Sequence, residues 1–227
     1  MLKINMAILT LAAASAVTTH AATVVLDTGH SPQRSGSMSP SGKTEYAYNL
    51  QMSTYVSEYL AKYGITVIRV AADGKDIALK KRTAATDMAD LFLSIHHDSI
   101  QQEWIDQGRR RDFNGFSTFV SAKNPDYPFS LACAKRIGAG MRAAGERPSL
   151  YHAEKVKGEN RPLVDRQNGV HQFDDLVVLK MAKTPAVLLE VGVIANPEEE
   201  VRLATAATAL PIARAIADAV VNCLYRN

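Results

Sequence analysis

The chain has 227 residues, of which 47% are hydrophobic and 22% charged, and its net charge is +3 at pH 7. This length suits one domain with a substantial core. The slight basic excess does not by itself indicate a partner, and the one basic cluster, Arg109 to Arg111, has no interleaved aromatic residues. We therefore exclude nucleic acid from the expected partners.

The first 21 residues have the order of a secretory signal peptide. Lys3 gives a positive start, Met6 to Val17 is an uncharged apolar run, and Ala21 supplies a small residue at the cleavage position. The run is shorter than the roughly 20 residues that span a bilayer. We predict a signal peptide at residues 1–21 and one domain at 22–227. An uncleaved anchor or a disordered tail is the alternative. With no later membrane span expected, the mature chain should be periplasmic or extracellular.

The two cysteines, Cys133 and Cys223, lie among small apolar residues. An exported protein can join them in a disulfide, but two buried helical thiols fit the sequence equally well. Neither has the close Cys or His spacing of a thiolate zinc site. The sequence leaves the choice between a disulfide and free thiols open.

Short apolar runs alternate along the chain with longer segments that lack Pro and Gly or have helical periodicity. The predicted strands are residues 23–26, 65–70, 91–95, 115–120, 176–179 and 186–189. The predicted helices are residues 43–63, 76–89 and 128–141, and two more that begin near residues 196 and 210. The segments 31–42, 97–114 and 144–170 are polar and are predicted to be loops.

The C-terminal helices carry the clearest local pattern. Asn196 can accept hydrogen bonds from free backbone N–H groups, and Pro197 fits the first helical position. The last helix has an apolar stripe at spacings of three and four residues, formed by Leu210, Ala213, Ala217, Val220 and Leu224. Strands that alternate with helices, several of them apolar throughout, predict a three-layer α/β fold with a mostly parallel sheet. Ligands of such folds bind beyond the carboxyl ends of the strands.

Ionisable residues occur at three of these strand ends. His30 follows the first strand, His96 and His97 end the third, and Glu190 ends the last, while Glu45 begins the first helix. Two imidazoles and a carboxylate can hold a catalytic zinc ion and leave a position for water. A second carboxylate nearby can then take a proton from that water.

Each of these residues also has a structural interpretation. A histidine at a strand end is more often a hydrogen-bonded structural residue, and Glu45 in a first helical turn normally opposes the helix dipole. Glu190 follows an apolar run, so a salt bridge to a Lys or Arg is its structural alternative. Spacing alone does not decide between the two interpretations.

Four motifs occur in a fixed order. They are Asp27-Thr28-Gly29-His30, Glu45 at the start of the next helix, Ser94-Ile95-His96-His97-Asp98, and PAVLLEVGVIAN at residues 185–196. Together they resemble the zinc-dependent N-acetylmuramoyl-L-alanine amidases of the cell-division and sporulation type, over about residues 23–224. Thr28 departs from the family's usual proline, and His97 stands where a small residue is usual.

The resemblance implies a six-stranded central sheet and one zinc ion bound by His30, Glu45 and His96. It implies that Glu190 is the catalytic carboxylate. The expected reaction is hydrolysis of the amide bond between N-acetylmuramic acid and L-alanine in peptidoglycan or muropeptides. Adjacent strand residues point in opposite directions, so only one of His96 and His97 should face the metal. Motif position favours His96, with an exchange of roles as the alternative and a substrate contact as a further role for His97.

Two other functions fit an exported chain with these motifs. One is a zinc carboxypeptidase acting within the peptide stem, although such enzymes typically use a short H-x-x-E ligand run that is absent between His30 and Glu45. The other is a non-catalytic wall-binding module, which is expected to have lost a ligand or Glu190.

The polar segment 148–170 is predicted to be either a plain solvated loop or a mobile lid that contacts substrate. Its candidate substrate contacts are His152, Asn160 and Arg161. The stretch 151–161 lacks the apolar stripe needed to dock a covering helix. We therefore expect activity without an activator protein.

Overall fold

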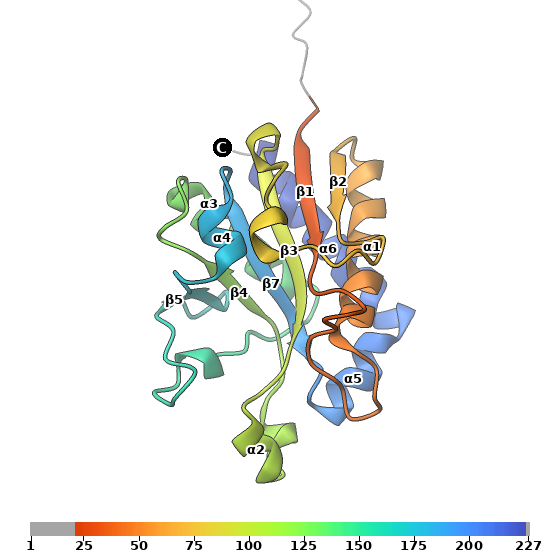
Figure 1. Ribbon diagram of the computed structural model, residues 1–227, viewed down its shortest axis with the longest axis vertical. Helices are drawn as coiled ribbons and strands as arrows, with labels where there is room; N and C mark the ends of the chain where they lie inside the picture. Colours follow the sequence, from red (N-terminus) through yellow and green to blue (C-terminus); the bar gives the residue numbers. More distant parts are fainter. Residues whose placement is uncertain (1–20, 226–227) are drawn as a thin grey trace, which may run out of the picture.

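The computed structural model describes residues 21–225 (Figure 1). The predicted signal peptide, apart from Ala21, lies outside the described residues. A seven-stranded sheet forms the centre of the molecule, in the order β2-β1-β3-β7-β4-β6-β5. The strands are β1 (Thr23–Thr28), β2 (Thr66–Val70), β3 (Leu91–Asp98), β4 (Ser117–Val120), β5 (Leu163–Asp165), β6 (Val170–Gln172) and β7 (Ala186–Val193).

The α/β class is confirmed, but the sheet has one strand more than expected and is mixed. Strands β2, β1, β3 and β7 are parallel to one another, whereas β4 runs antiparallel to β7. Strand β6 is parallel to β4, and β5 is antiparallel to β6. Of the two unexpected strands, β5 lies within the segment 144–170 predicted as a loop, and β6 begins at its last residue. Neither was predicted, because each has only three residues and little periodicity to detect.

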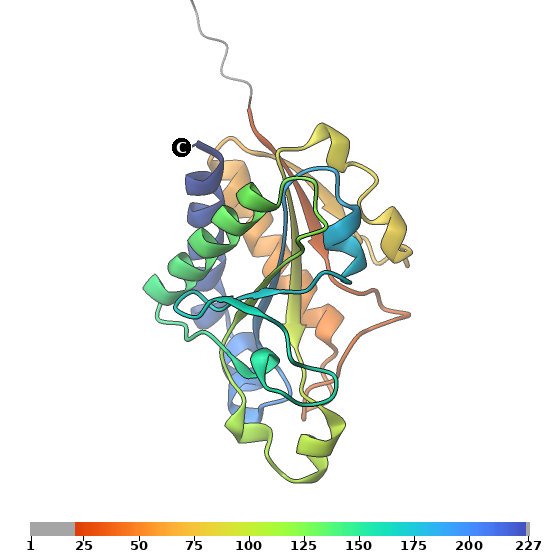
Figure 2. The same cartoon turned by 90° about the vertical axis from the view of Figure 1, so that its left-hand side faces the viewer.

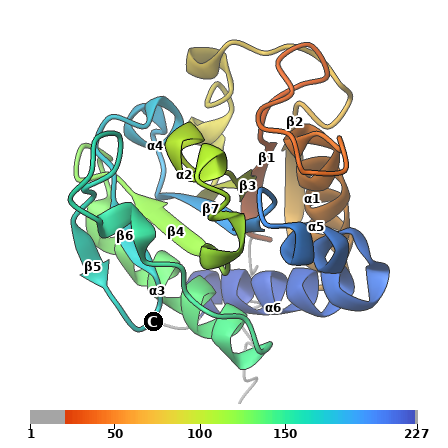
Figure 3. The same ribbon diagram turned by 90° about the horizontal axis from the view of Figure 1, so that it is seen from below.

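Helices cover the two faces of the sheet unequally. The helices are α1 (Glu45–Lys62), α2 (Gln102–Asp106), α3 (Tyr127–Ala143), α4 (Val177–Met181), α5 (Pro197–Ala204) and α6 (Ala206–Tyr225). Helices α1, α3 and α6 pack on one face (Figure 3). The other face carries α4 and a smaller apolar cluster. We call these the helical face and the thin face. The thin face leaves room for a site near the strand ends.

Successive side chains of a strand point to opposite faces of the sheet, so each strand contributes to both the helical face and the thin face. In β3, Leu91, Leu93 and Ile95 belong to the core under the helical face, and Phe92 belongs to the cluster under the thin face. The same alternation places Ser94 and His96 toward the thin face and His97 toward the helices. His97 accordingly packs against Tyr48 of α1, with ring centroids 5.4 Å apart.

Two predicted elements are wrong. Residues 76–89 do not form one helix but two short 3₁₀ turns, Leu79–Lys81 and Thr86–Met88. The chain bends between them because Arg82 is buried with its guanidinium on Asp27. The predicted strand 176–179 is helix α4, which packs Val178 and Leu179 on the thin face. A short apolar run does not distinguish a strand from a buried helical turn.

The C-terminal predictions are confirmed in type. Asn196 caps α5 by accepting from the backbone N–H groups of Glu198 and Glu199. By length and composition α6 could cross a bilayer, which corrects the expectation that no later segment reaches that length. It instead packs against α1 and α3, with the predicted stripe residues Ala213, Ala217 and Val220 fully buried. The core therefore accounts for its apolar composition.

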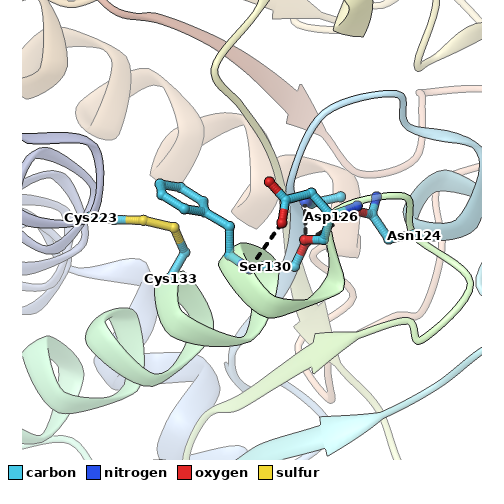
Figure 4. The surroundings of a disulfide bond; sticks show 7 residues. Asn124, Asp126, Ser130, Cys133 and Cys223 are labelled. Atoms are coloured by element: carbon cyan, nitrogen blue, oxygen red, sulfur yellow. Dashed lines mark hydrogen bonds between the residues drawn. A yellow bond between two sulfur atoms is a disulfide. The ribbon is translucent and has the colours of Figure 1, made fainter. Parts of the chain in front are cut away.

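A disulfide joins Cys133 of α3 to Cys223 of α6 (Figure 4), which resolves the choice left open by the sequence. Both residues are fully buried, and their Cα atoms are 5.3 Å apart. The start of α3 is tied to β7 as well, since the hydroxyl of Ser130 accepts a hydrogen bond from the backbone of Ala186. A cross-link of this kind typically stabilises a fold by about 2–4 kcal/mol.

Candidate metal centre and active site

Three side chains predicted as metal ligands converge at the carboxyl end of the parallel strands. His30 comes from the loop after β1, Glu45 from the first residue of α1, and His96 from β3. One oxygen of Glu45, Oε1, lies 3.0 Å from His30 Nε2 and 3.0 Å from His96 Nδ1. All three candidate ligand atoms lie within 4.8 Å of one another. Tetrahedral zinc bonds of 2.0–2.1 Å separate ligand atoms by roughly 3.3 Å. The donor set and its spacing therefore fit zinc.

Two glycines make room for this cluster. A Cβ atom on Gly29 would lie 2.5 Å from the His96 ring. A Cβ on Gly36, whose φ is +73°, would lie 2.3 Å from Glu45 Oε2 and 2.8 Å from the His30 ring. Only glycine fits at either position without displacing a ligand. Gly29 belongs to the motif that led to His30, whereas Gly36 lies in a Ser- and Gly-rich loop whose role the sequence did not indicate.

A buried ion pair holds the backbone that carries His30. Arg82 Nη1 donates to Asp27 Oδ1 at 2.7 Å, and the Ser94 hydroxyl donates to the other oxygen of Asp27 at 2.7 Å. The guanidinium also donates to the carbonyls of Thr28 and His30. His30 has a φ of 68°, an unusual value for a residue other than glycine. Sequence analysis did not assign this role to Asp27 or Arg82, although a buried aspartate beside a ligand requires a partner.

His97 lies behind the cluster and acts on it through Asn49. Asn49 donates to the carbonyl of Gly29 at 3.1 Å and to Glu45 Oε1 at 3.3 Å. Its side-chain oxygen lies 2.8 Å from His97 Nδ1. An amide oxygen only accepts, so His97 donates and fixes the orientation of the Asn49 amide. His97 is 2% exposed. This burial is at odds with the predicted substrate contact of His97, and His96, not His97, lies in the cluster with His30 and Glu45.

Glu190 lies beside the cluster, opposite His96 in the pairing of β3 with β7. Its Oε2 has no hydrogen-bond partner among residues 21–225, and no Lys or Arg in this range pairs with it. The structural salt bridge considered for Glu190 therefore does not form there. Burial, together with the nearby carboxylates of Asp98 and Glu45, raises the pKa of Glu190 well above its ordinary value. The positive charge of a bound metal ion would act in the opposite direction.

The segment after α3 is anchored near Glu190 by a buried histidine. His152 Nε2 lies 2.7 Å from Asp98 Oδ2, and His152 Nδ1 lies 2.9 Å from Glu159 Oε2. Burial alone would lower the pKa of His152, but the two carboxylates raise it to about 9. The Tyr151 hydroxyl also donates to Asp98. His152 thus bridges β3 and the loop. Both of its ring nitrogens contact carboxylates of the protein, so they do not face the substrate as predicted.

The other two predicted contacts in this segment differ from each other. Asn160 is exposed and has a φ of 70°. Arg161 is half-buried, with its guanidinium 3.7 Å from the centre of the Phe173 ring. The segment lies along the β5 edge of the sheet, which faces the viewer in Figure 2. Through His152 and strands β5 and β6 it is held to the domain at several points.

Two hollows meet at His96. The Arg34 hollow has a volume of about 280 Å³, and its lining includes His30, Arg34, Arg82, His96 and Leu188. The Arg161 hollow has a volume of about 300 Å³, and its lining includes His96, Asp98, His152, Arg161, Phe173 and Glu190. A substrate that reaches both hollows passes His96 at their junction and meets Glu190 in the Arg161 hollow.

Comparison with known proteins gives the family. Residues 24–222 match the family model described as N-acetylmuramoyl-L-alanine amidase, Amidase_3. The chain belongs to this family. Its reaction is the hydrolysis of the amide bond between N-acetylmuramic acid and L-alanine in peptidoglycan, and zinc is general to its members.

Relatives extend over most of the chain. N-acetylmuramoyl-L-alanine amidase AmiA of Escherichia coli K12 is 27% identical, and the match covers 89% of this chain and 76% of AmiA. The probable cell wall amidase LytH of Staphylococcus aureus is 28% identical, over 78% of this chain and half of LytH.

Solved structures share the fold. An N-acetylmuramoyl-L-alanine amidase from Clostridium difficile 630 has a TM-score of 0.75 at 22% identity, covering 92% of this chain and 100% of that chain. The catalytic domain of CwlV from Bacillus (Paenibacillus) polymyxa has a TM-score of 0.69 at 27% identity, covering 88% and 97%.

Proposed function

We propose that this chain is a zinc-dependent N-acetylmuramoyl-L-alanine amidase in which His30, Glu45 and His96 hold one zinc ion and Glu190 transfers the proton. One observation carries the proposal: Glu190, whose Oε2 has no hydrogen-bond partner among residues 21–225, lines the Arg161 hollow next to a three-residue metal cluster. A zinc ion in this cluster would supply Lewis acidity and make water more acidic.

Glu190 accepts a proton from the attacking water and returns it to the nitrogen of the departing L-alanine. Its carboxylate suits both steps, because its Oε2 has no hydrogen-bond partner among residues 21–225 and can take and give the proton. Asp27 and Arg82 position His30, and Asn49 and His97 position Glu45. These residues act through the ligands and do not themselves touch the substrate.

Two alternatives are less well supported. A carboxypeptidase acting within the stem would belong to another family, whereas the family match spans residues 24–222. A wall-binding module without activity has no reason to retain three candidate ligands and a half-buried Glu190 without an ion-pair partner together.

We further propose that the chain is exported through a signal peptide at residues 1–21 and acts in the periplasm or outside the cell. AmiA and LytH, which are named as cell wall amidases or N-acetylmuramoyl-L-alanine amidases, are consistent with this location. The CwlD amidase of Clostridioides difficile has been solved in complex with the GerS lipoprotein. For this chain we propose activity without such a partner. Helix α3 packs on α6 at the helical face, so it does not cover the metal cluster.

The test uses residues 22–227 purified with zinc and incubated with peptidoglycan. An amidase frees L-alanine amino groups. A carboxypeptidase releases stem residues without freeing those groups, and a binding module releases neither. Treatment with a strong chelator should abolish the release, and added zinc should restore it. Full activity of metal-free protein would contradict the zinc mechanism.

A further inference from the structure

The Arg161 hollow contains an arginine that has no carboxylate partner among residues 21–225. Arg161 Nη2 donates to the carbonyl of Gly158 at 3.1 Å, and Nη1 donates to the carbonyl of Glu159 at 3.4 Å. The guanidinium is stacked on Phe173 at 3.7 Å. Backbone contacts and an aromatic ring therefore fix the group in place without neutralising its charge. A guanidinium held in this way retains N–H donors that fit the two oxygens of a carboxylate.

Two of the three carboxylates that line the same hollow are already engaged, and the third is Glu190. Asp98 and Glu159 are both paired with His152, and Glu159 also accepts from Gln101 at 2.7 Å. They leave Arg161 as the cation available to an incoming anion. Neither of these two carboxylates forms an ion pair with Arg161, although the nearby charge of Arg161 helps to lower the pKa of Glu159.

The Arg34 hollow differs in this respect. Arg34 is paired with Asp76 at 2.7 Å, and Arg82 is paired with Asp27 at 2.7 Å. Both of its arginines are neutralised within the protein. The two hollows thus meet at His96 but differ in whether an arginine lacks a carboxylate partner. A substrate with an uncharged glycan on one side of the scissile bond and a carboxylate-bearing peptide on the other has a matching arginine for the peptide only in the Arg161 hollow.

Resting on the proposed function, we propose that the Arg161 hollow binds the peptide stem and that Arg161 binds a free carboxylate of the stem close to the scissile bond. The enzyme then distinguishes stems with a free carboxylate from stems in which this group is amidated. Arg161 is thus a specificity-determining residue, separate from the zinc ligands and from Glu190.

The experiment compares two soluble substrates that differ only at that group: N-acetylmuramoyl-L-alanyl-D-isoglutamate and its isoglutamine amide. A hydrogen bond to a charged group contributes about 1.5–3 kcal/mol, so kcat/KM of the zinc-loaded wild type should favour the free carboxylate by roughly 10- to 100-fold. Arg161→Gln should lose this preference, mainly by raising KM for the carboxylate substrate with little change in kcat. Arg161→Lys keeps the charge without the planar fork and should retain an intermediate preference.

Lys155→Gln is the matched control, because Lys155 is an exposed cation of the same loop outside the hollow. It should behave as the wild type with both substrates. Equal cleavage of the two substrates by the wild type, or an undiminished preference in Arg161→Gln, would overturn the inference and leave the proposed function intact. Failure of the wild type to cleave either substrate or peptidoglycan would overturn both.

Discussion

The two halves of the sheet differ in how they hold the active site. Strands β2, β1, β3 and β7 are parallel, and their ends carry His96 and Glu190. Strands β4, β6 and β5 are short, and the loops around them carry His152 and Arg161. In the parallel half, Arg82 holds the backbone of His30 and Asn49 holds the carboxylate of Glu45. The other half is held by the ion pairs of His152 with Asp98 and Glu159, which require His152 to be protonated. This difference suggests that chemistry resides in the first half and substrate selection in the second.

The largest effect should follow from Glu190→Gln, which keeps the size of the side chain and removes the base. Turnover should fall by about 10²–10⁴-fold, the usual contribution of proton transfer. Zinc content, measured by metal analysis, should stay at one ion per chain, because Glu190 lies outside the ligand cluster. Near-normal turnover by a zinc-loaded variant would show that the parallel half does not contain the base.

A strong effect is also expected from Arg82→Met, which leaves Asp27 buried without its partner. Breaking a buried ion pair of this kind typically costs about 3–5 kcal/mol of folding free energy. The variant should unfold at lower denaturant concentration and bind zinc more weakly, since the His30 carbonyl also loses its donor. Arg34→Met provides the stability control, because that ion pair is exposed. Equal loss of stability in both variants would contradict the positioning role of Arg82.

The loop half should respond to pH through His152. The pKa of His152 is raised from 6.5 to about 9, so its contribution to stability is complete below pH 6.5 and is lost as the pH rises through 9. The full contribution is about 3 kcal/mol at one pKa unit per 1.36 kcal/mol. The stability gap between wild type and His152→Gln, measured by denaturant unfolding, should therefore narrow between pH 6.5 and 9.5.

The control for this pH effect is His171→Gln. Burial lowers the pKa of His171 to about 4, so it stays neutral over the same range. The free energy of unfolding of the His171→Gln variant should change with pH by the same amount as that of the wild type. A constant gap for His152→Gln across the range would show that the loop is not held by a charged histidine.

The smallest of these effects should come from His97→Ala. Without its donor, Asn49 can rotate away from Glu45, and residues behind a metal ligand typically affect affinity by about 10–100-fold. The variant should still bind one zinc ion, measured by competition with a chelating dye. His96→Ala should lose the metal altogether. Loss of zinc in His97→Ala with retention in His96→Ala would reverse the assignment of the two histidines.

The sequence alone predicted the parts of the site that follow from local residue patterns. Strand alternation allowed only one of His96 and His97 to face the metal, and the structure places His96 in the cluster. The pairing of Asp27 with Arg82 joins residues 55 positions apart, so no local periodicity predicts it. The same limit applies to Asn49, which looks like any polar helical residue until its contacts with Gly29 and Glu45 are known.

Fold prediction failed where segments are short. Strands β5 and β6 are stabilised by pairing with each other and with β4, not by their own composition. Helix α4 was mistaken for a strand because its apolar run fits either structure, and its packing on the thin face decides the outcome. The strongly periodic helices and long strands were predicted with boundaries shifted by only a few residues.

The link between Cys133 and Cys223 encloses the chain segment that contains both Arg161 and Glu190, while His30, Glu45 and His96 precede it. A single proteolytic cut in the exposed stretch near Lys155 would therefore yield two fragments that remain one covalent molecule. The larger fragment would keep the three candidate zinc ligands, and the smaller would keep Glu190, the proposed proton carrier, and Arg161. The cross-link would hold these complementary fragments together in the nicked protein.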